Sequence, residues 1–248
     1  MKSLNNARAL STLLVVAIIL AIIVVSIIGV VIINFWIMPG NLITEEKEYS
    51  NFTVVDVSSA FKVDIVQSNS YSVNITASEN IFDKLDVTQE GNTLVIRAGP
   101  NIPFSSVYRA EIGMPELTEL ILSGASKGTA EGFSNSNSIV LKVSGASRLD
   151  MQEIHVGDIE IELSGASTLI AEGSGSNLVS IVEGASRLDL ANFPVENTNM
   201  DVSGASQATI NLNGRLDAIV SGASALYYIG EPIMGNIETS GNSTVNKK

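Results

Sequence analysis

Hydrophobic and polar residues alternate along most of the chain, and a short motif recurs in this pattern about every twenty residues. The tetrapeptide Ser-Gly-Ala-Ser occurs five times, and the variants EGAS at 183–186 and SGNS at 240–243 continue the series. The central glycines, separated by 21, 20, 19, 20, 18 and 19 residues, are Gly124, Gly145, Gly165, Gly184, Gly204, Gly222 and Gly241. In the first six copies, the serines two residues later are Ser126, Ser147, Ser167, Ser186, Ser206 and Ser224. This spacing is typical of a repeat architecture.

Apolar residues stand at even offsets from each repeat glycine. Two residues before it, the sequence has Leu122, Val143, Leu163, Val182, Val202 and Val220. A period of two predicts β-strands with one buried face, because successive side chains of a strand point to opposite sides. Stacking one repeat per turn buries that face, so we predict an all-β parallel β-helix, or β-solenoid, of about seven turns of 18–21 residues. In this register the glycine and the following serine both face inward, either at a tight corner or on a straight strand lined by small residues.

The segment before the repeats keeps the alternation but lacks the tetrapeptide. Phe61, Val63 and Ile65 alternate with polar residues, and Gly91-Asn92 predicts a turn between two strands. We therefore expect residues 49–117 to form irregular β turns that cap the N-terminal end. Residues 118–248 would form the solenoid proper, closed by a last repeat whose polar residues blunt an open sheet edge.

The first 38 residues have a different character. Residues 9–38 are 30 consecutive uncharged, mostly aliphatic residues, and about 20 are enough to cross a bilayer as a helix. We predict a retained transmembrane helix at 9–38 rather than a cleaved signal peptide, whose apolar region is about 7–15 residues long. A short N-terminus, 1–8, would precede this helix, and a linker, 39–48, would follow it.

Charges on either side of this span predict its orientation. Lys2 and Arg8 precede the span, while Glu45, Glu46 and Glu48 follow it. The positive-inside rule then places residues 1–8 in the cytoplasm and the C-terminal domain outside the cell membrane, as a single-pass protein.

Composition excludes several classes of function. The chain has 14 basic and 26 acidic residues, and its formal net charge is −12. Only two of the basic residues precede the predicted span, so the remainder carries a charge of −14. A nucleic-acid partner is not expected, because binding to phosphates needs basic surface. The absence of Cys and the single histidine, His155, exclude thiol catalysis and sites built from Cys or several histidines.

Three segments outside the tetrapeptides carry a resemblance to a known family: FKVDIVQ at 61–67, GNTLVI at 91–96 and GMPEL at 113–117. Together with the serial SGAS units, they resemble the GIN-domain putative auto-transporter adhesin family (head GIN domain) over about residues 49–245. The resemblance implies a surface protein with a parallel β-helix-like fold and a role in adhesion. It implies no catalytic residues.

The residues offer little sign of catalysis or metal binding. His155 lies between predicted strands, with no nucleophile or orienting acid identifiable beside it, so an exposed loop histidine is expected. Asp158, Glu160 and Glu162 share a predicted outward face that could attract calcium, but the spacing matches no calcium-binding loop, and we expect a solvated acidic face. The recurring serines are expected to be structural, because a catalytic serine would occur once. We expect no catalytic residue, cofactor or metal.

A carbohydrate-active enzyme remains the weaker alternative. Stacked turns would place Asp150 and Asp189 two steps apart, about 9.6 Å, as in some polysaccharide-cleaving β-helices. No aromatic sugar platform accompanies them in the sequence.

The sequence thus predicts a membrane-anchored, extracytoplasmic, adhesin-like solenoid that binds a glycan or a surface protein. A structural envelope module that self-assembles into homo-oligomers is the main alternative. Asn51, Asn74 and Asn242 fit the N-glycosylation pattern and are candidate modification sites.

Overall fold

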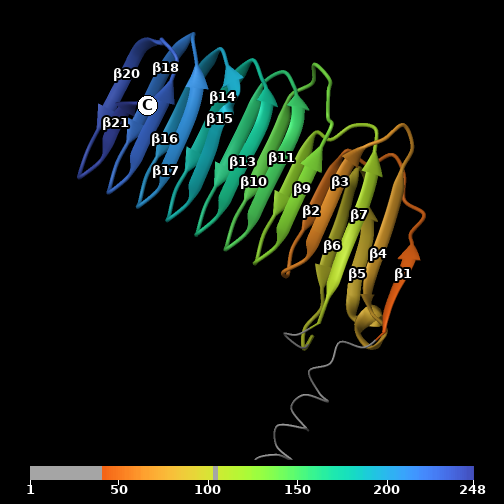
Figure 1. Cartoon of the computed structure of the whole chain (residues 1–248). Helices are drawn as coiled ribbons and strands as arrows, with labels where there is room; N and C mark the ends of the chain where they lie inside the picture. Colours follow the sequence, from red (N-terminus) through yellow and green to blue (C-terminus); the bar gives the residue numbers. More distant parts are fainter. Residues whose placement is uncertain (1–40, 103–105) are drawn as a thin grey trace, which may run out of the picture.

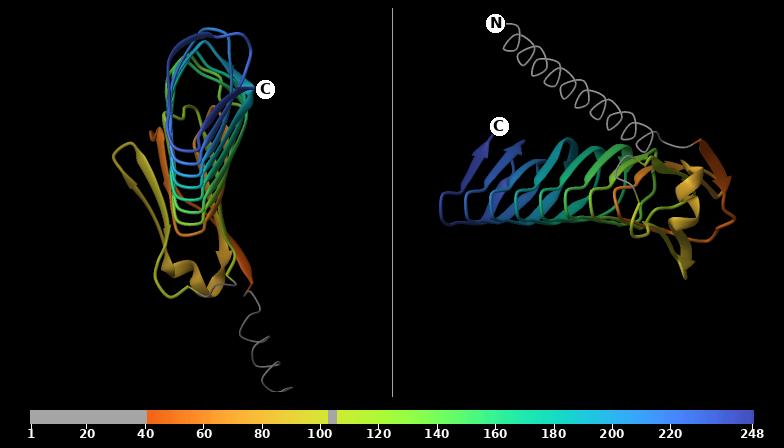
Figure 2. Two further views of the ribbon diagram at one scale, coloured as in Figure 1. Left: turned by 90° about the vertical axis from the view of Figure 1, so that its left-hand side faces the viewer. Right: turned by 90° about the horizontal axis from the view of Figure 1, so that it is seen from below.

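Two β-sheets face each other along the described part of the chain, residues 41–102 and 106–248 of a computed structural model (Figure 1). Seen end-on, the turns superimpose as a narrow flattened loop (Figure 2). This arrangement confirms the predicted all-β solenoid. The predicted transmembrane segment 9–38 lies outside the described residues, and within the described ones no helix is long and apolar enough to cross a bilayer.

Sheet A has eleven strands in the order β1-β4-β7-β3-β9-β11-β13-β15-β17-β19-β21, and sheet B has ten in the order β20-β18-β16-β14-β12-β10-β8-β2-β6-β5. The elements before the repeats are β1 (Leu42–Glu46), β2 (Val54–Val57), β3 (Lys62–Gln67), β4 (Ser72–Ser78), the 3₁₀ helix η1 (Glu79–Lys84), β5 (Leu85–Glu90), β6 (Thr93–Ala98) and β7 (Tyr108–Met114). The repeat strands of sheet B are β8 (Glu119–Leu122), β10 (Ile139–Val143), β12 (Ile159–Leu163), β14 (Asn177–Val182), β16 (Asn197–Val202), β18 (Arg215–Val220) and β20 (Ile233–Thr239). Those of sheet A are β9 (Lys127–Glu131), β11 (Arg148–His155), β13 (Thr168–Ser174), β15 (Arg187–Val195), β17 (Gln207–Leu212), β19 (Ala225–Ile229) and β21 (Thr244–Lys247).

Each repeat contributes one strand to each sheet. The stack advances in six steps from the pair β8–β9 to the pair β20–β21, and all these repeat strands pair in parallel. Leu141 lies beside Ile161, and Leu149 beside Leu169, so equivalent repeat positions form columns. From Leu120 to Leu226, the columns two, four and six positions from the glycine are buried between the sheets, as the period of two predicts, whereas the last repeat is more exposed.

The SGAS units form the corner between the two sheets. Of the two alternatives that the sequence left open, the tight corner is therefore correct and the straight strand lined by small residues is not. All seven repeat glycines have φ between 73° and 82°, a left-handed conformation that favours glycine. They are exposed at the corner, so the expectation that the glycine faces inward is wrong. The serine two residues later is buried, as expected; Ser167 Oγ, for example, donates a hydrogen bond to the Ser164 carbonyl at 2.7 Å.

The segment before the repeats continues the stack in an altered chain order. Strand β2 pairs in parallel with both β6 and β8, and β3 pairs in parallel with both β7 and β9. Along the stack, the pair β6–β7 therefore lies beyond β2–β3, although it follows it in the chain. Strands β1, β4 and β5 pair antiparallel at this end. The Gly91-Asn92 turn joins β5 to β6, as predicted.

A degenerate copy of the tetrapeptide forms the corner between β2 and β3. Val57 pairs with Leu122 and Lys62 pairs with Lys127, which aligns Ser58–Phe61 with the SGAS unit at 123–126. Ser59 takes the place of the glycine, with φ of 65°. The sequence pattern missed this copy because serine replaces the glycine and Phe61 replaces the buried serine.

Candidate functional site

Oppositely charged side chains pair along individual strands on the outer faces. Residues two apart on a strand share a face, and the pairs are Lys62–Asp64 at 3.0 Å, Arg109–Glu111 at 3.1 Å, Arg148–Asp150 at 2.6 Å, Arg187–Asp189 at 2.8 Å and Arg215–Asp217 at 2.6 Å. These ion pairs are largely solvent-exposed, so each contributes little to the stability of the fold. They fix the orientation of the charged groups and neutralise the surface locally. The recurring basic-x-acidic spacing is visible in the sequence and could have predicted these pairs.

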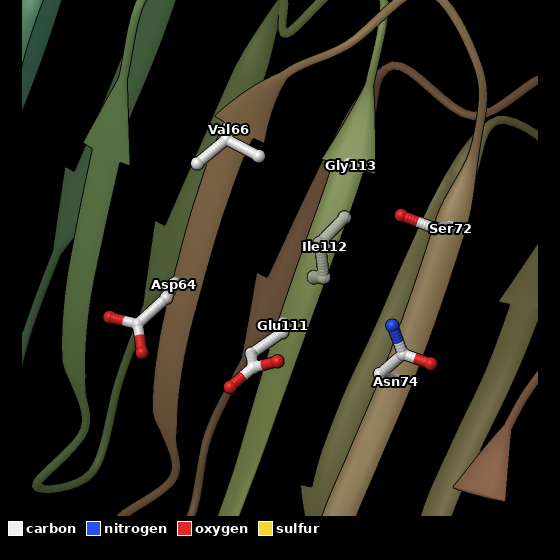
Figure 3. Close-up of a pocket in the computed structure, with 7 residues that line it drawn as sticks. All are labelled: Asp64, Val66, Ser72, Asn74, Glu111, Ile112 and Gly113. Atoms are coloured by element: carbon white, nitrogen blue, oxygen red, sulfur yellow. The ribbon is translucent and has the colours of Figure 1, made fainter.

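A shallow hollow of about 370 Å³ opens on the outer face of sheet A, over β3, β7 and β4 (Figure 3). Its lining residues are Asp64, Val66, Ser72, Asn74, Glu111, Ile112 and Gly113. The register explains the hollow: Gly113 lies between Val66 and Ser72 on its two neighbouring strands and fills no space there. A Cβ atom at this position would lie 2.6 Å from the Ser72 Oγ.

One row of polar side chains crosses the hollow. Asp64 neighbours Glu111, which neighbours Asn74, on three adjacent strands. Asp64 is held by its ion pair to Lys62 and by a 2.8 Å hydrogen bond from the Thr129 hydroxyl. The row therefore presents fixed acceptors next to the amide of Asn74, with the half-exposed Val66 as the apolar neighbour.

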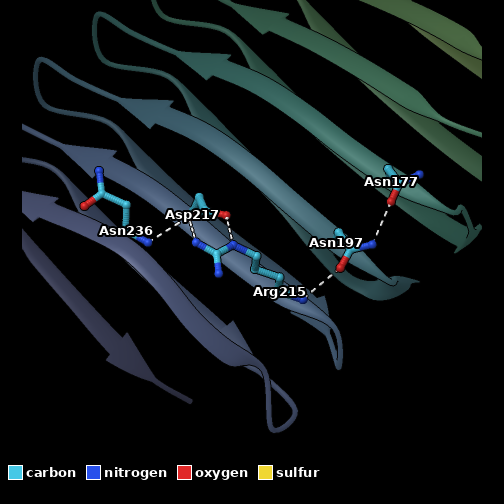
Figure 4. A network of polar contacts seen from close by, with 5 residues as sticks. All are labelled: Asn177, Asn197, Arg215, Asp217 and Asn236. Atoms are coloured by element: carbon cyan, nitrogen blue, oxygen red, sulfur yellow. Dashed lines mark hydrogen bonds and ion pairs between the residues drawn. The ribbon is translucent and has the colours of Figure 1, made fainter.

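A second polar network runs across sheet B near the starts of its strands, at the end away from the SGAS corner (Figure 4). The Asn197 amide donates to the Asn177 side-chain oxygen at 2.9 Å, and the Arg215 backbone N–H donates to the Asn197 side-chain oxygen at 2.9 Å. Hydrogen bonds from the Arg215 guanidinium and from the Asn236 backbone N–H lower the pKa of Asp217. Each of these contacts joins neighbouring turns or fixes a side chain, so we assign the network a structural role.

His155 does have a hydroxyl beside it, which the sequence analysis did not anticipate. Its Nδ1 lies 2.9 Å from the Ser174 Oγ, on the neighbouring strand β13. In the described part of the chain no carboxylate hydrogen-bonds to this imidazole. His155 and Ser174 therefore lack the acidic third member of a catalytic triad there. The pair lies at the ends of β11 and β13, where His155 is exposed and Ser174 half-buried.

The other acidic candidates are separated or already paired. Asp150 and Asp189 lie two strands apart, with Ile170 between them as predicted, and each forms an ion pair with an arginine. Glu160 and Glu162 are exposed on sheet B. Within 41–102 and 106–248, no three His, Asp or Glu side chains gather in a way that would hold a metal ion.

The three candidate glycosylation sites differ in their surroundings. Asn51 and Asn242 are exposed, at the turn before β2 and at the last corner. Asn74 is half-buried in the middle of β4. The hydroxyl of Thr76, which completes its sequon, is hydrogen-bonded to Thr44 at 2.7 Å. Modification of these residues stays a prediction.

Comparisons with known proteins agree on the fold. The family model described as "Putative auto-transporter adhesin, head GIN domain" matches residues 51–232. Among solved structures, a putative adhesin from Bacteroides fragilis is similar with a TM-score of 0.79 and 19% identity, over 85% of this chain and 99% of that chain. A putative adhesin from Parabacteroides distasonis has a TM-score of 0.65 and 14% identity, over 84% of this chain and 98% of that chain. A putative lipid binding protein from the same species has a TM-score of 0.65 and 18% identity, over 84% and 97%. No curated protein matches the chain.

Proposed function

Because the chain belongs to the putative auto-transporter adhesin family with a head GIN domain, we propose that it is a non-catalytic binding protein of the cell surface. Residues 9–38 anchor it in the cell membrane, and the solenoid stands outside the cell. The ligand is a glycan or a protein of another surface. The protein recognises this ligand through many weak contacts along a rigid body, and it does not convert the ligand chemically.

One observation carries this proposal: in the described residues the interior of the solenoid is filled by side chains, and the charged groups and most amides lie on the outer faces. The columns at even offsets from the repeat glycine consist mainly of buried apolar side chains, from Leu120 at one end to Leu226 at the other. The outward columns carry ordered charges and amides at a spacing of about 4.8 Å from turn to turn. Such a surface suits docking to an extended partner better than enclosing a substrate.

Attachment of cells tests the proposal. Cells that express the full-length chain should attach to surfaces coated with cell-wall or host glycans more strongly than cells that express residues 1–48 alone. Equal attachment of both across glycan-coated and protein-coated surfaces would contradict it. If the glycan is cleaved, Asp150, Asp189 and Glu160 are replaced. Cleavage that continues in the variant excludes an enzyme built on these carboxylates, whereas cleavage that is lost would favour the enzyme.

Self-assembly is a second candidate because, in the described part of the chain, the terminal strands of both sheets pair on one side only. Strands β20 and β21 end the stack on one side, and β1 and β5 end it on the other. Edge strands offer free backbone donors and acceptors to a second copy. Sedimentation of the full-length chain in detergent distinguishes the candidates: a monomer over a wide concentration range would count against self-assembly.

A further inference from the structure

The hollow at Gly113 has the size and lining of a small-ligand site. Its volume of about 370 Å³ falls within the range of about 300–1,000 Å³ that is typical of ligand pockets. It is formed by three strands of a continuous sheet, so its walls are held by the backbone ladder rather than by a loop. Such a site needs little reorganisation when a ligand binds.

Charge narrows the class of ligand. Asp64 and Glu111 are each paired with a cation, Lys62 and Arg109, so the two ion pairs at the hollow have no net charge, while Glu46 and Glu131 lie farther out, beside Asn74 and Val66 on the flanking strands. A cation would compete with Lys62 and Arg109 for the carboxylates. An anion would be repelled by the two carboxylates in the hollow. It would also be repelled by the charge of −14 that the residues after the predicted span carry.

The remaining groups favour a molecule that carries both hydroxyl groups and an apolar face. Carboxylate oxygens accept hydrogen bonds, and the Asn74 amide both donates and accepts. Within the described residues the Asn74 side chain forms no hydrogen bond, and it lines the hollow, where a ligand can reach it. Val66, 46% exposed, borders the same hollow and can contact C–H groups.

We infer that the hollow formed by Asp64, Val66, Asn74, Glu111 and Gly113 binds one residue of a neutral saccharide. Its hydroxyl groups donate to the two carboxylates and its C–H face packs on Val66. This inference rests on the proposed binding function and assigns it a site and a ligand class. Since the hollow is open, binding of a single sugar residue is weak, with a Kd on the order of 1–10 mM, and useful attachment needs many copies on the cell surface.

Titration of the full-length chain in detergent micelles, followed by the backbone amide NMR signals of Asn74 and Gly113, tests the inference. The probes are methyl β-D-glucopyranoside, methyl β-D-galactopyranoside and methyl α-D-mannopyranoside, with glucuronate and calcium chloride as charged comparisons. At least one neutral hexoside should shift both signals in a saturable way. Glucuronate and calcium should shift them less at the same concentration.

Two variants place the effect in the hollow. Gly113→Val fills it; the added Cβ would lie 2.6 Å from the Ser72 Oγ, which can rotate away, and 3.4 Å or more from Ser68 and Ser70. It should weaken hexoside binding at least tenfold. Asn74→Ala is the second variant, in case Gly113→Val does not fold, and it should weaken binding severalfold. The matched control Asn199→Ala, an exposed asparagine on the outer face of β16, should bind as the wild type does.

The outcomes separate this inference from the proposed function. Saturable hexoside binding that both hollow variants weaken supports the inference. No shift with any hexoside, equal binding by Gly113→Val, or stronger shifts with glucuronate or calcium would overturn it. If cells with Gly113→Val then still attach to glycan-coated surfaces, the adhesive function stands and uses another part of the solenoid. If wild-type cells do not attach either, the proposed function fails together with the inference.

Discussion

The backbone carbonyl oxygen of Gly145 lies 2.5 Å from the position that a Cβ atom on Gly165 would occupy. The same carbonyl accepts a hydrogen bond from the Ala166 N–H at 2.7 Å. The corner therefore needs glycine for two independent reasons, its left-handed backbone and the close approach of the turn beneath it. This contact recurs at successive corners, which explains why the glycine is the most regular position of the repeat.

Replacing a corner glycine should therefore destabilise the solenoid more than replacing a glycine in an open turn. Gly165 and Gly91 both have positive φ, 77° and 64°, but a Cβ atom on Gly91 would meet nothing within 4 Å. We expect Gly91→Ala to lower the free energy of unfolding by about 1 kcal/mol and Gly165→Ala to lower it by about 3 kcal/mol or more. Urea denaturation of the two variants measures the difference. Equal losses would show that backbone conformation alone, without the carbonyl contact, determines the glycine.

The buried hydroxyl group of Thr198 interrupts the apolar interior without a hydrogen bond in the described residues. Thr198 is 3% exposed, its column neighbours are Leu178 and Leu216, and its hydroxyl has no hydrogen-bond partner in the described part of the chain. Thr198→Val keeps the shape and removes the unpaired group, so it should raise the free energy of unfolding by about 1 kcal/mol. The outward-facing Thr168→Val should change it by less than about 0.5 kcal/mol. A loss of stability in Thr198→Val would indicate that water or another group satisfies this hydroxyl.

Asp217 should make stability depend on pH at acidic values. Hydrogen bonds from Arg215 and from the Asn236 N–H lower its pKa below the ordinary value of 3.8. A group with a lowered pKa in the folded state stabilises the fold above its unfolded pKa and loses this effect as the pH falls through the folded pKa. Asp217→Asn should therefore lower the midpoint of thermal unfolding at pH about 7, and the deficit should shrink towards pH about 2.

The control for this measurement is Asp201→Asn, since Asp201 is exposed on β16 and forms no ion pair within the described residues. It should change the midpoint little at either pH. A deficit of Asp217→Asn that is the same at both pH values would contradict the assigned ion pair.

The sequence pattern predicted the solenoid correctly because both of its signals are local. A period of two identifies the buried face from side chains alone, and the regular SGAS spacing aligns neighbouring turns, so pairs such as Leu149 with Leu169 followed directly. The position of the glycine was predicted wrongly. Alternation was extended through the corner, although a left-handed residue such as Gly165 breaks the strand there.

The candidate site could not be predicted, because it depends on strands brought together out of chain order. Asn74 and Glu111 meet only because β7 inserts between β4 and β3. The early corner at Ser59 was hidden by substitution, since a non-glycine residue occupies the left-handed position there. One signal is present in the sequence: the basic-x-acidic spacing of Lys62 and Asp64 on β3 recurs at Arg109 and Glu111 on β7, the other charged strand at the hollow.

The proposed binding role requires that the solenoid lies outside the cell, and one measurement tests this location directly. The chain has no Cys, so Asn199→Cys and Ser3→Cys each introduce a single thiol, on the outer face of β16 and in the N-terminal segment. Intact cells that express either full-length variant are treated with a membrane-impermeant maleimide before and after lysis. We expect Asn199→Cys to be labelled on intact cells and Ser3→Cys only after lysis. Labelling of Asn199→Cys that requires lysis would contradict a surface-binding role for this protein.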